Sequence, residues 1–445
     1  MSNQQAFRAA LLRLIPPSSR CVVAYSGGLD SHVLLHLCTR LAGITLRAIH
    51  VHHGLQARAD DWATHCAAVC RDLQVSLDIV HVDARPEKGQ SPEEAARTVR
   101  YRVLREHICN GEILLAAHHA DDQAETLLLQ LLRGAGVHGL AGMPETGEFG
   151  RGLLLRPFLG VTRVALREYA TAHKLSWVED TSNVDESFDR NFLRRQVMPL
   201  LRQRWPAAPQ VLARSAAHCA EAAEILDQRA RELLPSVQGA TKNTLRIAPL
   251  IELPETNQRL LLRAWLRTNG FRMPPTNILE RVLSEAIPAR PDRTPRVEWG
   301  EGEIRRYRDH LHLLNPLPPV PPNWHTSWRG DAPLPLPDGR ALHAEREKGA
   351  GIAPEFWRPE AIEVRYRQGG ERCRLPGRAG THELKKLLQE GGLPPWERER
   401  LPLVYINGEL AAVGDLWVCG VFGGGMEGAN VQLRVSACRP NGAQM

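Results

Sequence analysis

A glycine-rich turn near the N-terminus of the 445-residue chain combines residue types that bind phosphate. It reads Ser26–Gly27–Gly28–Leu29–Asp30–Ser31 and lies between two apolar runs, 21–25 and 33–41. Adjacent glycines permit positive φ and a close approach of the backbone to a ligand. A helix that begins after such a turn also presents unpaired N–H groups to an anion. The six residues therefore predict a phosphate-binding turn between a strand and a helix.

The acid within this turn distinguishes it from a Walker A loop. A Walker A loop has a Lys before its Ser or Thr, whereas this turn has no Lys and Asp30 precedes Ser31. A carboxylate beside phosphates is favourable when it holds Mg2+, because the ion also binds phosphate oxygens. Asp30 is therefore a candidate Mg2+ ligand. The alternative is an ordinary glycine-rich turn between a strand and a helix.

A second polar cluster follows the apolar run 114–117. It contains two histidines and then three acids: His118, His119, Asp121, Asp122 and Glu125. Glu125 would share a helix face with Asp121 and Asp122, and like charges this close repel unless a cation lies between them. The cation could be Mg2+ or an amine substrate. The alternative is that the acids only stabilise the N-terminus of a helix.

Arginines and lysines form a third group of candidates. Arg97 and Arg100 share a face of a predicted helix, where they could clamp phosphates of ATP or RNA or form a solvated basic face. Arg194 and Arg195 follow the polar stretch 179–183, and this segment could close over a nucleotide. The candidate contacts to RNA phosphates are Arg194, Arg195, Arg372, Lys385 and Lys386. Glutamates interleave with the last three, so a solvated mixed surface is the alternative there.

The turn and the acids come together if residues 1–205 form a parallel α/β sheet. Strand-like runs at 21–25, 45–51, 75–82, 113–117 and 153–155 alternate with helix-like segments. This alternation predicts a doubly wound, mostly parallel sheet. Ligands of such sheets bind at the carboxyl ends of the strands. The segments that would meet at that edge are 26–31, 52–58, 83–90 and 118–125.

Two further domains are expected after this α/β domain. Residues 206–315 have mostly helical periodicity, with a β-like piece at 296–314. The proline-dense segment 316–322 is typical of a stiff linker. Short alternating strands beyond it predict a small α+β domain over 323–445.

Composition narrows the class of protein. The net charge of +6 is moderately basic and suits a polyanionic partner such as RNA. No apolar run reaches membrane-spanning length, and the N-terminus does not resemble a signal peptide. The nine cysteines are scattered without a Cys-x-x-Cys pair, so we expect free thiols and a cytoplasmic protein. The sequence leaves open whether the chain is a monomer or a homodimer.

The turn Ser-Gly-Gly-x-Asp-Ser after a strand resembles the PP-loop of the N-type ATP pyrophosphatases. That family cleaves ATP between the α and β phosphates and adenylates an oxygen of its substrate. Additional stretches resemble one branch of the family, the lysidine synthases: residues 51–55, 95–101, 114–136, 156–159, 177–194 and 367–408. The match is almost continuous over the first 200 residues and looser over 206–360.

The resemblance implies a reaction as well as a fold. Lysidine synthases use ATP to adenylate the C2 oxygen of the wobble cytidine in the isoleucine tRNA with a CAU anticodon. The amine of free L-lysine then displaces AMP, so that the tRNA decodes AUA instead of AUG. By this resemblance ATP and Mg2+ are the cofactors, and the expected catalytic residues are Asp30, Arg97, Asp121, Asp122 and Glu125. Which acid binds lysine, binds Mg2+ or acts as the base is left open.

Two other functions fit parts of the sequence. A tRNA thiolase of the same ATP-using class would need a reactive cysteine or iron–sulfur ligands, and Cys66 and Cys70 lie in mid-helix. A non-catalytic nucleotide-binding or RNA-binding module would not require Asp30 or the three acids near residue 122.

Overall fold

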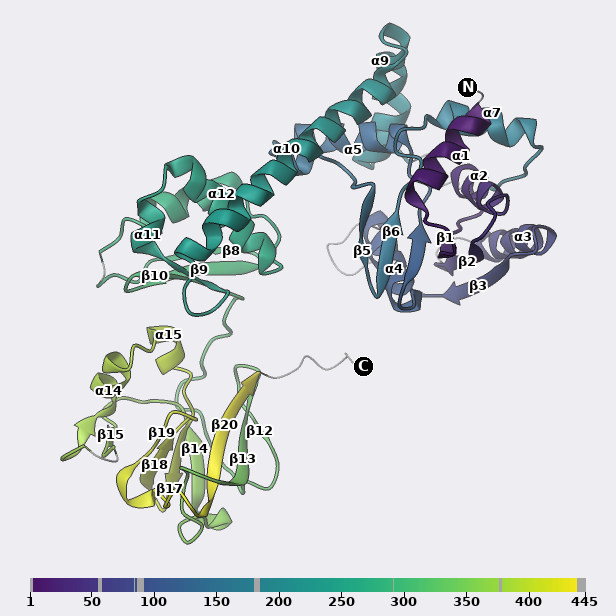
Figure 1. Cartoon of the computed structure of the whole chain (residues 1–445). Coiled ribbons are helices and arrows are strands. Elements are labelled where there is room, and N and C mark those ends of the chain that lie inside the picture. The colour runs from purple at the N-terminus through teal and green to yellow at the C-terminus, as the bar shows by residue number, and fades with distance from the viewer. Residues whose placement is uncertain are drawn as a thin grey trace. The chain divides into compact units, whose positions relative to one another are not determined.

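The computed structural model describes residues 3–54, 58–83, 85, 92–179, 185–290, 292–375 and 378–437. The chain forms two compact units, Met1–Arg229 and Ala230–Met445 (Figure 1). Parts of the segments predicted to line the site, namely 55–57, 84, 86–90 and 180–183, lie outside the described residues. The domain and linker boundaries expected at residues 205, 315 and 322 remain predictions.

The first unit contains the predicted mostly parallel sheet. Its strands are β1 Arg20–Ala24, β2 Thr45–His52, β3 Ser76–His81, β4 Glu112–Leu115, β5 Thr146–Phe149 and β6 Gly152–Leu155. They are arranged in the order β3-β2-β1-β4-β6-β5, and all neighbours are parallel except β5 and β6. The short antiparallel edge strand β5 was not expected, because its sequence Thr-Gly-Glu-Phe lacks a β-branched apolar run.

Helices cover both faces of this sheet, as a doubly wound fold requires. They are α1 Asn3–Leu14, α2 Leu29–Cys38, α3 Ala59–Asp72, α4 Pro92–His107, α5 Ala120–Leu132, α6 Val137–Leu140 and α7 Arg163–Ala172. One buried cluster joins Val23 of β1 to residues of α1, α2, α3 and α7. A second cluster joins Val22 to residues of α4. Successive strand residues point to opposite faces, so these clusters lie on opposite sides of the sheet.

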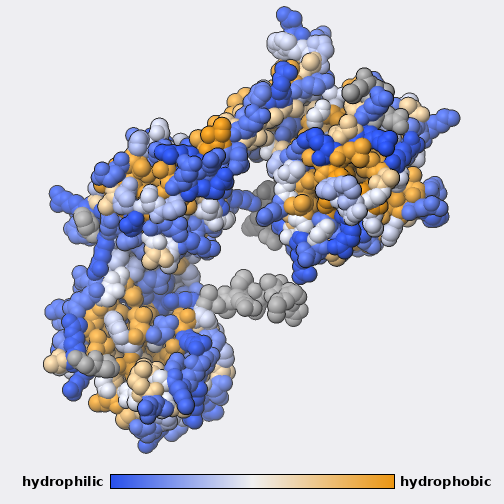
Figure 2. All heavy atoms as spheres, viewed as in Figure 1, coloured by the Kyte–Doolittle hydropathy of each residue, from blue (hydrophilic) through white to orange (hydrophobic). Residues whose placement is uncertain are grey.

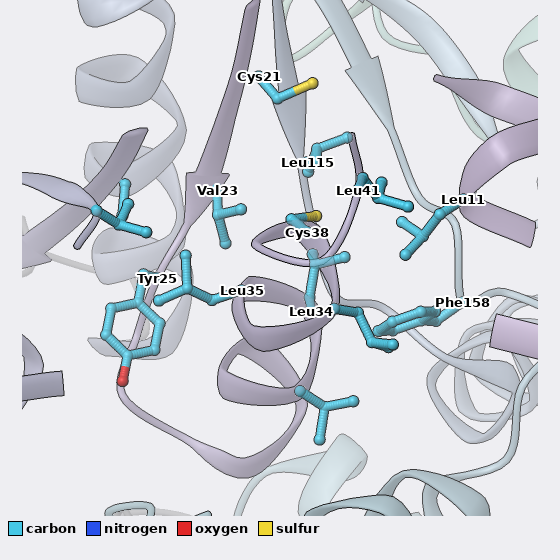
Figure 3. Close-up of a cluster of buried hydrophobic side chains, with 14 of the residues drawn as sticks. Leu11, Cys21, Val23, Tyr25, Leu34, Leu35, Cys38, Leu41, Leu115 and Phe158 are labelled. Atoms are coloured by element: carbon cyan, nitrogen blue, oxygen red, sulfur yellow. The ribbon is translucent and has the colours of Figure 1, made fainter. Parts of the chain in front are cut away.

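The helix α2 is held in the middle of the larger cluster. Leu34 and Leu35 are fully buried, and Figure 3 shows them beside Val23 of β1 and Phe158. Burying a side chain of this size contributes about 1.5–3 kcal/mol relative to leaving it exposed. The position of the glycine-rich turn is therefore fixed by a strand and a helix that are both anchored in the core.

The first unit continues through a short helical segment into a long helix. α8 Asp189–Phe192 leads into a π-helical turn at Leu193–Val197 and then into α9 Met198–Arg204. α10 spans Ala208–Val237, so the division between the two units falls within it.

The second unit begins with helices and an antiparallel sheet. The helical segments are α11 Ile247–Ile251, α12 Glu255–Thr268, α13 Thr276–Arg281 and the π-helical turn Val282–Ala286. The sheet has the order β7-β10-β9-β8, with β7 Thr244–Arg246, β8 Arg296–Trp299, β9 Gly302–Tyr307 and β10 His310–Leu314. Trp265 of α12 is buried between helices and sheet. The helices and the β-like piece expected here are thus both present.

The C-terminal part of the second unit is a small α+β fold, as predicted. One sheet has the order β11-β14-β17-β18-β19 and another the order β12-β13-β20. The strands are β11 His325–Ser327, β12 Leu334–Pro335, β13 Arg340–Lys348, β14 Ile362–Arg365, β17 Leu403–Ile406, β18 Glu409–Val413, β19 Trp417–Val418 and β20 Ala429–Ala437. This part also contains the hairpin β15 Arg372–Cys373 with β16 His382–Glu383, the helices α14 Leu384–Glu390 and α15 Pro395–Arg398, and 3-10 helices at Pro359–Ala361 and Gly420–Phe422.

One expectation about the cysteines is wrong. Cys373 and Cys419 form a disulfide, although the sequence offered no disulfide framework. The two residues are 46 positions apart, and both lie in the buried cluster around α14. Spacing along the chain gives no signal for such a pair, because only the fold brings the two residues together.

The face of the molecule seen in Figure 2 is largely hydrophilic with interspersed apolar areas. Across the described ranges, no helix is both long enough and apolar enough to cross a bilayer.

Candidate active site

The glycine-rich turn joins β1 to α2 and is closed by its own serines. The Oγ atoms of Ser26 and Ser31 are 3.1 Å apart, and Ser31 Oγ donates a hydrogen bond of 3.0 Å to the carbonyl of Gly28. Gly28 precedes the helix with an extended backbone, φ −75° and ψ 165°. Only Gly27 of the pair has positive φ, at +79°. The freedom to adopt positive φ is therefore used at Gly27 and not at Gly28.

Gly27 is also required by the space around it. A Cβ atom at this position would lie 2.8 Å from Cys66 Sγ and 3.0 Å from Val178 Cγ2. The carbonyl of Gly27 accepts a 3.0 Å hydrogen bond from the N–H of Val178. The turn is thus packed between α3 and the segment around Val178, which leaves no room for a side chain.

Asp30 lies in the first turn of α2 and has an unsatisfied oxygen. Its Oδ2 is 3.6 Å from His119 Nε2, while its buried Oδ1 has no hydrogen-bond partner among the described residues. Mg2+ is commonly held by one or two carboxylates together with substrate phosphates. In the described ranges no group of three or more His, Cys, Asp or Glu side chains could hold a metal alone. Asp30 therefore fits a Mg2+ ion that is shared with bound phosphates.

His119 links Asp30 to the acids of α5. It is 2% exposed and lies 3.6 Å from Asp30, 3.7 Å from Asp121 and 3.4 Å from Asp122. Burial lowers the pKa of His119, but the charges of Asp122, Asp30 and Asp121 outweigh it, so that the net direction is upward. These carboxylates therefore favour the protonated form of His119, whereas the backbone N–H of Asp122, which donates to Nδ1 at 3.3 Å, favours the neutral form.

Asp121 is held by the protein on both of its oxygens. Its Oδ2 accepts a 2.8 Å hydrogen bond from the backbone N–H of Arg163, the first residue of α7, and its Oδ1 accepts one from Arg202 of α9. The side chain is 4% exposed. Asp121 thus ties α5 to α7 and α9, and its predicted catalytic role remains a prediction.

Asp122 and Glu125 form what we call the acid–arginine cluster with Arg190 and Arg194. Arg190 donates to Glu125 at 2.9 Å and to Asp122 at 3.1 Å. Arg194 donates to both oxygens of Glu125, at 2.8 and 2.9 Å, and to Asp122 at 3.1 Å. The Asp122 and Glu125 side chains are 13% and 2% exposed.

The charges of the cluster stabilise one another. Burial raises the pKa of Asp122, but the positive charges of His119, Arg190 and Arg194 lower it further, so that the carboxylate stays ionised. Burial lowers the pKa of Arg194, and its hydrogen bonds and charge interactions with Glu125 and Asp122 raise it overall. The same environment makes Asp122 a weak base.

The other predicted residues have contacts outside the acid–arginine cluster. Arg97 is exposed, with its guanidinium 4.9 Å from the ring of Tyr101, and its charge is one of those that lower the pKa of the buried His118. Arg195 forms an ion pair with Glu186, with 3.2 Å between its Nε and Glu186 Oε1. Arg372, Lys385 and Lys386 are exposed residues of the second unit. Their predicted contacts with RNA remain predictions.

Two residues of the site had no role assigned from the sequence: Arg190 and Arg202. His119 belonged to the predicted polar cluster, but the sequence did not show which acids it contacts. Arg190 precedes Arg194 by four residues, which is the spacing of neighbours on one helix face. That spacing was a usable signal for Arg190, whereas the contact between Arg202 and Asp121 depends on long-range packing.

Comparison with protein families agrees with the geometry of the turn. A model described as PP-loop domain matches residues 3–201. Models described as TilS substrate binding domain and TilS substrate C-terminal domain match residues 245–312 and 362–435. The first unit is therefore a PP-loop domain, with substrate-domain sequences following it.

Comparison with curated relatives identifies one family within the class of PP-loop proteins. A tRNA(Ile)-lysidine synthase of Methylococcus capsulatus is 49% identical over 96% of this chain and 97% of its own length. One from Coxiella burnetii is 43% identical over 90% of each chain. The chain belongs to the tRNA(Ile)-lysidine synthase family.

Among solved structures, the U34-tRNA thiolase NcsA from Methanococcus maripaludis is 16% identical with a TM-score of 0.43, covering 49% of this chain and 78% of that one.

Replacing Gly27 is expected to strain the turn. Gly27→Ala places a methyl group against Cys66 and Val178 at positive φ, which should cost about 1–3 kcal/mol of unfolding free energy. Urea unfolding and ATP binding measure the effect. Gly160→Ala is the control, because nothing lies within 4 Å of a Cβ there. Equal stability of the two variants would contradict the close packing of the turn.

The charge of His119 is expected to make stability depend on pH. Since the pKa of His119 is raised in the folded protein, its protonated form stabilises the fold below the ordinary histidine pKa. This contribution is lost as the pH rises through the raised pKa. His119→Asn keeps a residue suited to the helix N-cap but removes the charge. Urea unfolding should show a larger deficit for the variant at pH 6 than at pH 9; a deficit independent of pH would refute the charge.

Proposed function

We propose that this chain ligates L-lysine to C2 of the wobble cytidine in the isoleucine tRNA with a CAU anticodon, using ATP and releasing AMP and pyrophosphate. The observation that carries the proposal is the unsatisfied Oδ1 of Asp30 beside the closed glycine turn at the N-terminus of α2. Membership of the family whose members carry this name supports it. The product would decode AUA instead of AUG.

In the first step the cytidine O2 attacks the α-phosphorus of ATP and pyrophosphate leaves. The free N–H groups at the start of α2 are suited to bind phosphate oxygens. Asp30 would hold Mg2+, which supplies charge stabilisation for the leaving pyrophosphate. Gly27 fixes the shape of the turn, because its positive φ and the missing side chain let the backbone pack against α3 and the segment around Val178.

In the second step an amine of lysine attacks C2, the bond from C2 to the bridging oxygen breaks, and AMP leaves. A free lysine amine is mostly protonated at neutral pH, so it must lose a proton before attack. Asp122 and Glu125 are suited to bind a cation. Because the pKa of Asp122 is held low, we assign it to binding and not to proton transfer.

The second unit is proposed to bind the tRNA body. Lys385 and Lys386 are exposed on α14, and Arg372 is exposed on β15. Exposed cations of this kind bind nucleic acid mainly through phosphates. Since tRNA is a cytoplasmic substrate, we also propose a cytoplasmic location.

The overall reaction is tested by incubating the full-length protein with ATP, labelled lysine and tRNA transcripts. The isoleucine transcript with C34 is expected to take up label, and the same transcript with U34 is not. Asp30→Asn should lower tRNA-dependent pyrophosphate release at least about 100-fold while tRNA binding is kept. Asp72→Asn, at the exposed end of α3, is the control. Full pyrophosphate release by Asp30→Asn would sink this assignment.

Removing charge from α14 is expected to weaken tRNA binding. For the double variant Lys385→Ala/Lys386→Ala we expect a several-fold higher Kd for tRNA. We also expect the slope of log K against log salt concentration to become shallower by about 1 to 2. Filter binding at several salt concentrations measures both. Arg358→Ala removes an exposed charge elsewhere in the second unit and serves as the control. An unchanged slope for the lysine variant would show that α14 does not contact phosphate.

A further inference from the structure

The disulfide between Cys373 and Cys419 ties the hairpin of β15 and β16 to a larger sheet. Cys373 ends β15, and Cys419 follows directly after β19, the last strand of the sheet β11-β14-β17-β18-β19. The N–H of Cys419 donates to the carbonyl of Ala411 in β18 at 2.7 Å. The N–H of Gly420 donates at 2.6 Å to the carbonyl of Arg374, the residue after Cys373. The covalent link thus joins the hairpin to the edge of this sheet.

The hairpin has little backbone pairing of its own. β15 and β16 pair through Arg372 with Glu383 and through Cys373 with His382. An isolated two-stranded hairpin is at best marginally stable in water, and segments with few backbone hydrogen bonds open at a low cost in free energy. The disulfide and the apolar cluster around α14 therefore supply much of the hold on this hairpin.

The hairpin leads directly into α14, so the same link positions the exposed cations of this region. Leu384, Leu387 and Leu388 of α14 are buried in one cluster with Cys373 and Cys419. The exposed cations on this framework are Arg372, Arg374, Lys385 and Lys386. Side chains and loops that are held in place before binding lose less conformational freedom when a partner binds. The disulfide should therefore raise the affinity of this surface for RNA phosphates.

A disulfide is unusual in the compartment proposed for this protein. Cytoplasmic thiols are kept reduced, and the disulfides found among them are usually transient, catalytic or redox-sensing. The described cysteines of the first unit are free, whereas Cys373 and Cys419 are paired. These two are 2% and 5% exposed, so a small thiol reaches them when the hairpin opens. A pair under a weakly held hairpin is thus suited to reversible reduction.

We propose, resting on the tRNA binding and the cytoplasmic location proposed above, that Cys373 and Cys419 form a redox switch that sets the affinity for tRNA. The oxidised pair holds the hairpin and α14 in place and favours binding. Reduction releases the hairpin and weakens binding. The reductant is a low-molecular-weight thiol of the glutathione class.

The reduction proceeds by two thiol–disulfide exchanges. A thiolate of the reductant attacks one sulfur of the pair, the S–S bond breaks, and a mixed disulfide forms while the other cysteine leaves as a thiolate. A second thiolate attacks the mixed disulfide and releases the remaining cysteine together with the oxidised thiol dimer. Two electrons pass from the two thiols to the disulfide, and their two protons end on the cysteines. The oxidised dimer reverses the same steps.

The test is a redox titration of tRNA affinity. The full-length protein with Cys438→Ser, which removes a cysteine outside the described residues, is equilibrated at several ratios of reduced to oxidised glutathione. Alkylation and mass spectrometry count the free thiols, and filter binding gives the Kd for the isoleucine transcript. We expect the Kd to rise at least about fivefold as the pair becomes reduced, in step with the thiol count. ATP binding should not change.

Variants in the same background test whether the response comes from this pair. Cys373→Ser/Cys419→Ser should bind tRNA like the reduced protein in every buffer. Cys109→Ser is the matched control, because it removes an exposed free thiol of the first unit, and it should keep the full redox response. ATP binding and circular dichroism check that each variant is folded. The titration of the intact pair does not depend on the folding of the serine variant.

Three results would overturn the switch. They are equal tRNA affinity of the oxidised and reduced forms, a pair that stays oxidised or stays reduced at every glutathione ratio, and an undiminished redox response in the double serine variant. Failure of the proposed tRNA binding looks different. In that case neither form would bind the transcript, although the thiol count would still follow the buffer.

Discussion

The buried carboxylates at the edge of the N-terminal sheet impose the constraint on which the rest of the site depends. Ionised acids can be removed from water only if opposite charges or hydrogen-bond donors replace the water. The protein meets this need for the three acids of α5 and only in part for Asp30. Arg202 and the start of α7 hold Asp121, and Arg190 and Arg194 hold Asp122 and Glu125. His119 lies beside one oxygen of Asp30, whose other oxygen has no hydrogen-bond partner among the described residues. The helices α7, α8 and α9 are placed where these partners are needed.

Much of the first unit could be predicted because its signals are local. The apolar run in β1, the glycine turn and the apolar helix α2 are adjacent in sequence, and their alternation with later strands implies a parallel sheet. The carboxyl ends of the strands then bring Asp30 and the acids of α5 to one edge. The closeness of Asp30 to the acids of α5 could therefore be predicted from the order of strands and helices alone.

Partners supplied from distant parts of the chain could not be predicted. Asp121 and Asp122 have the same chemistry in sequence, yet one is held by the backbone of α7 and the other by two arginines. The difference comes from tertiary packing, which residue type does not reveal. The disulfide between Cys373 and Cys419 and the short edge strand β5 are absent from local patterns for the same reason.

The π-helical turn at Leu193–Val197 has a consequence for how this segment can change in evolution. A π-helical turn holds one residue more than an α-helical turn of the same hydrogen-bonded span, and it behaves as a one-residue insertion in a helix. Deleting any one residue of the turn would restore a regular helix and rotate everything after it by about 100°. Arg202 would then leave Asp121, while Arg190 before the turn would not move. The length of this segment is thus as strongly constrained as the identity of its arginines, and gaps should be rare here in aligned relatives.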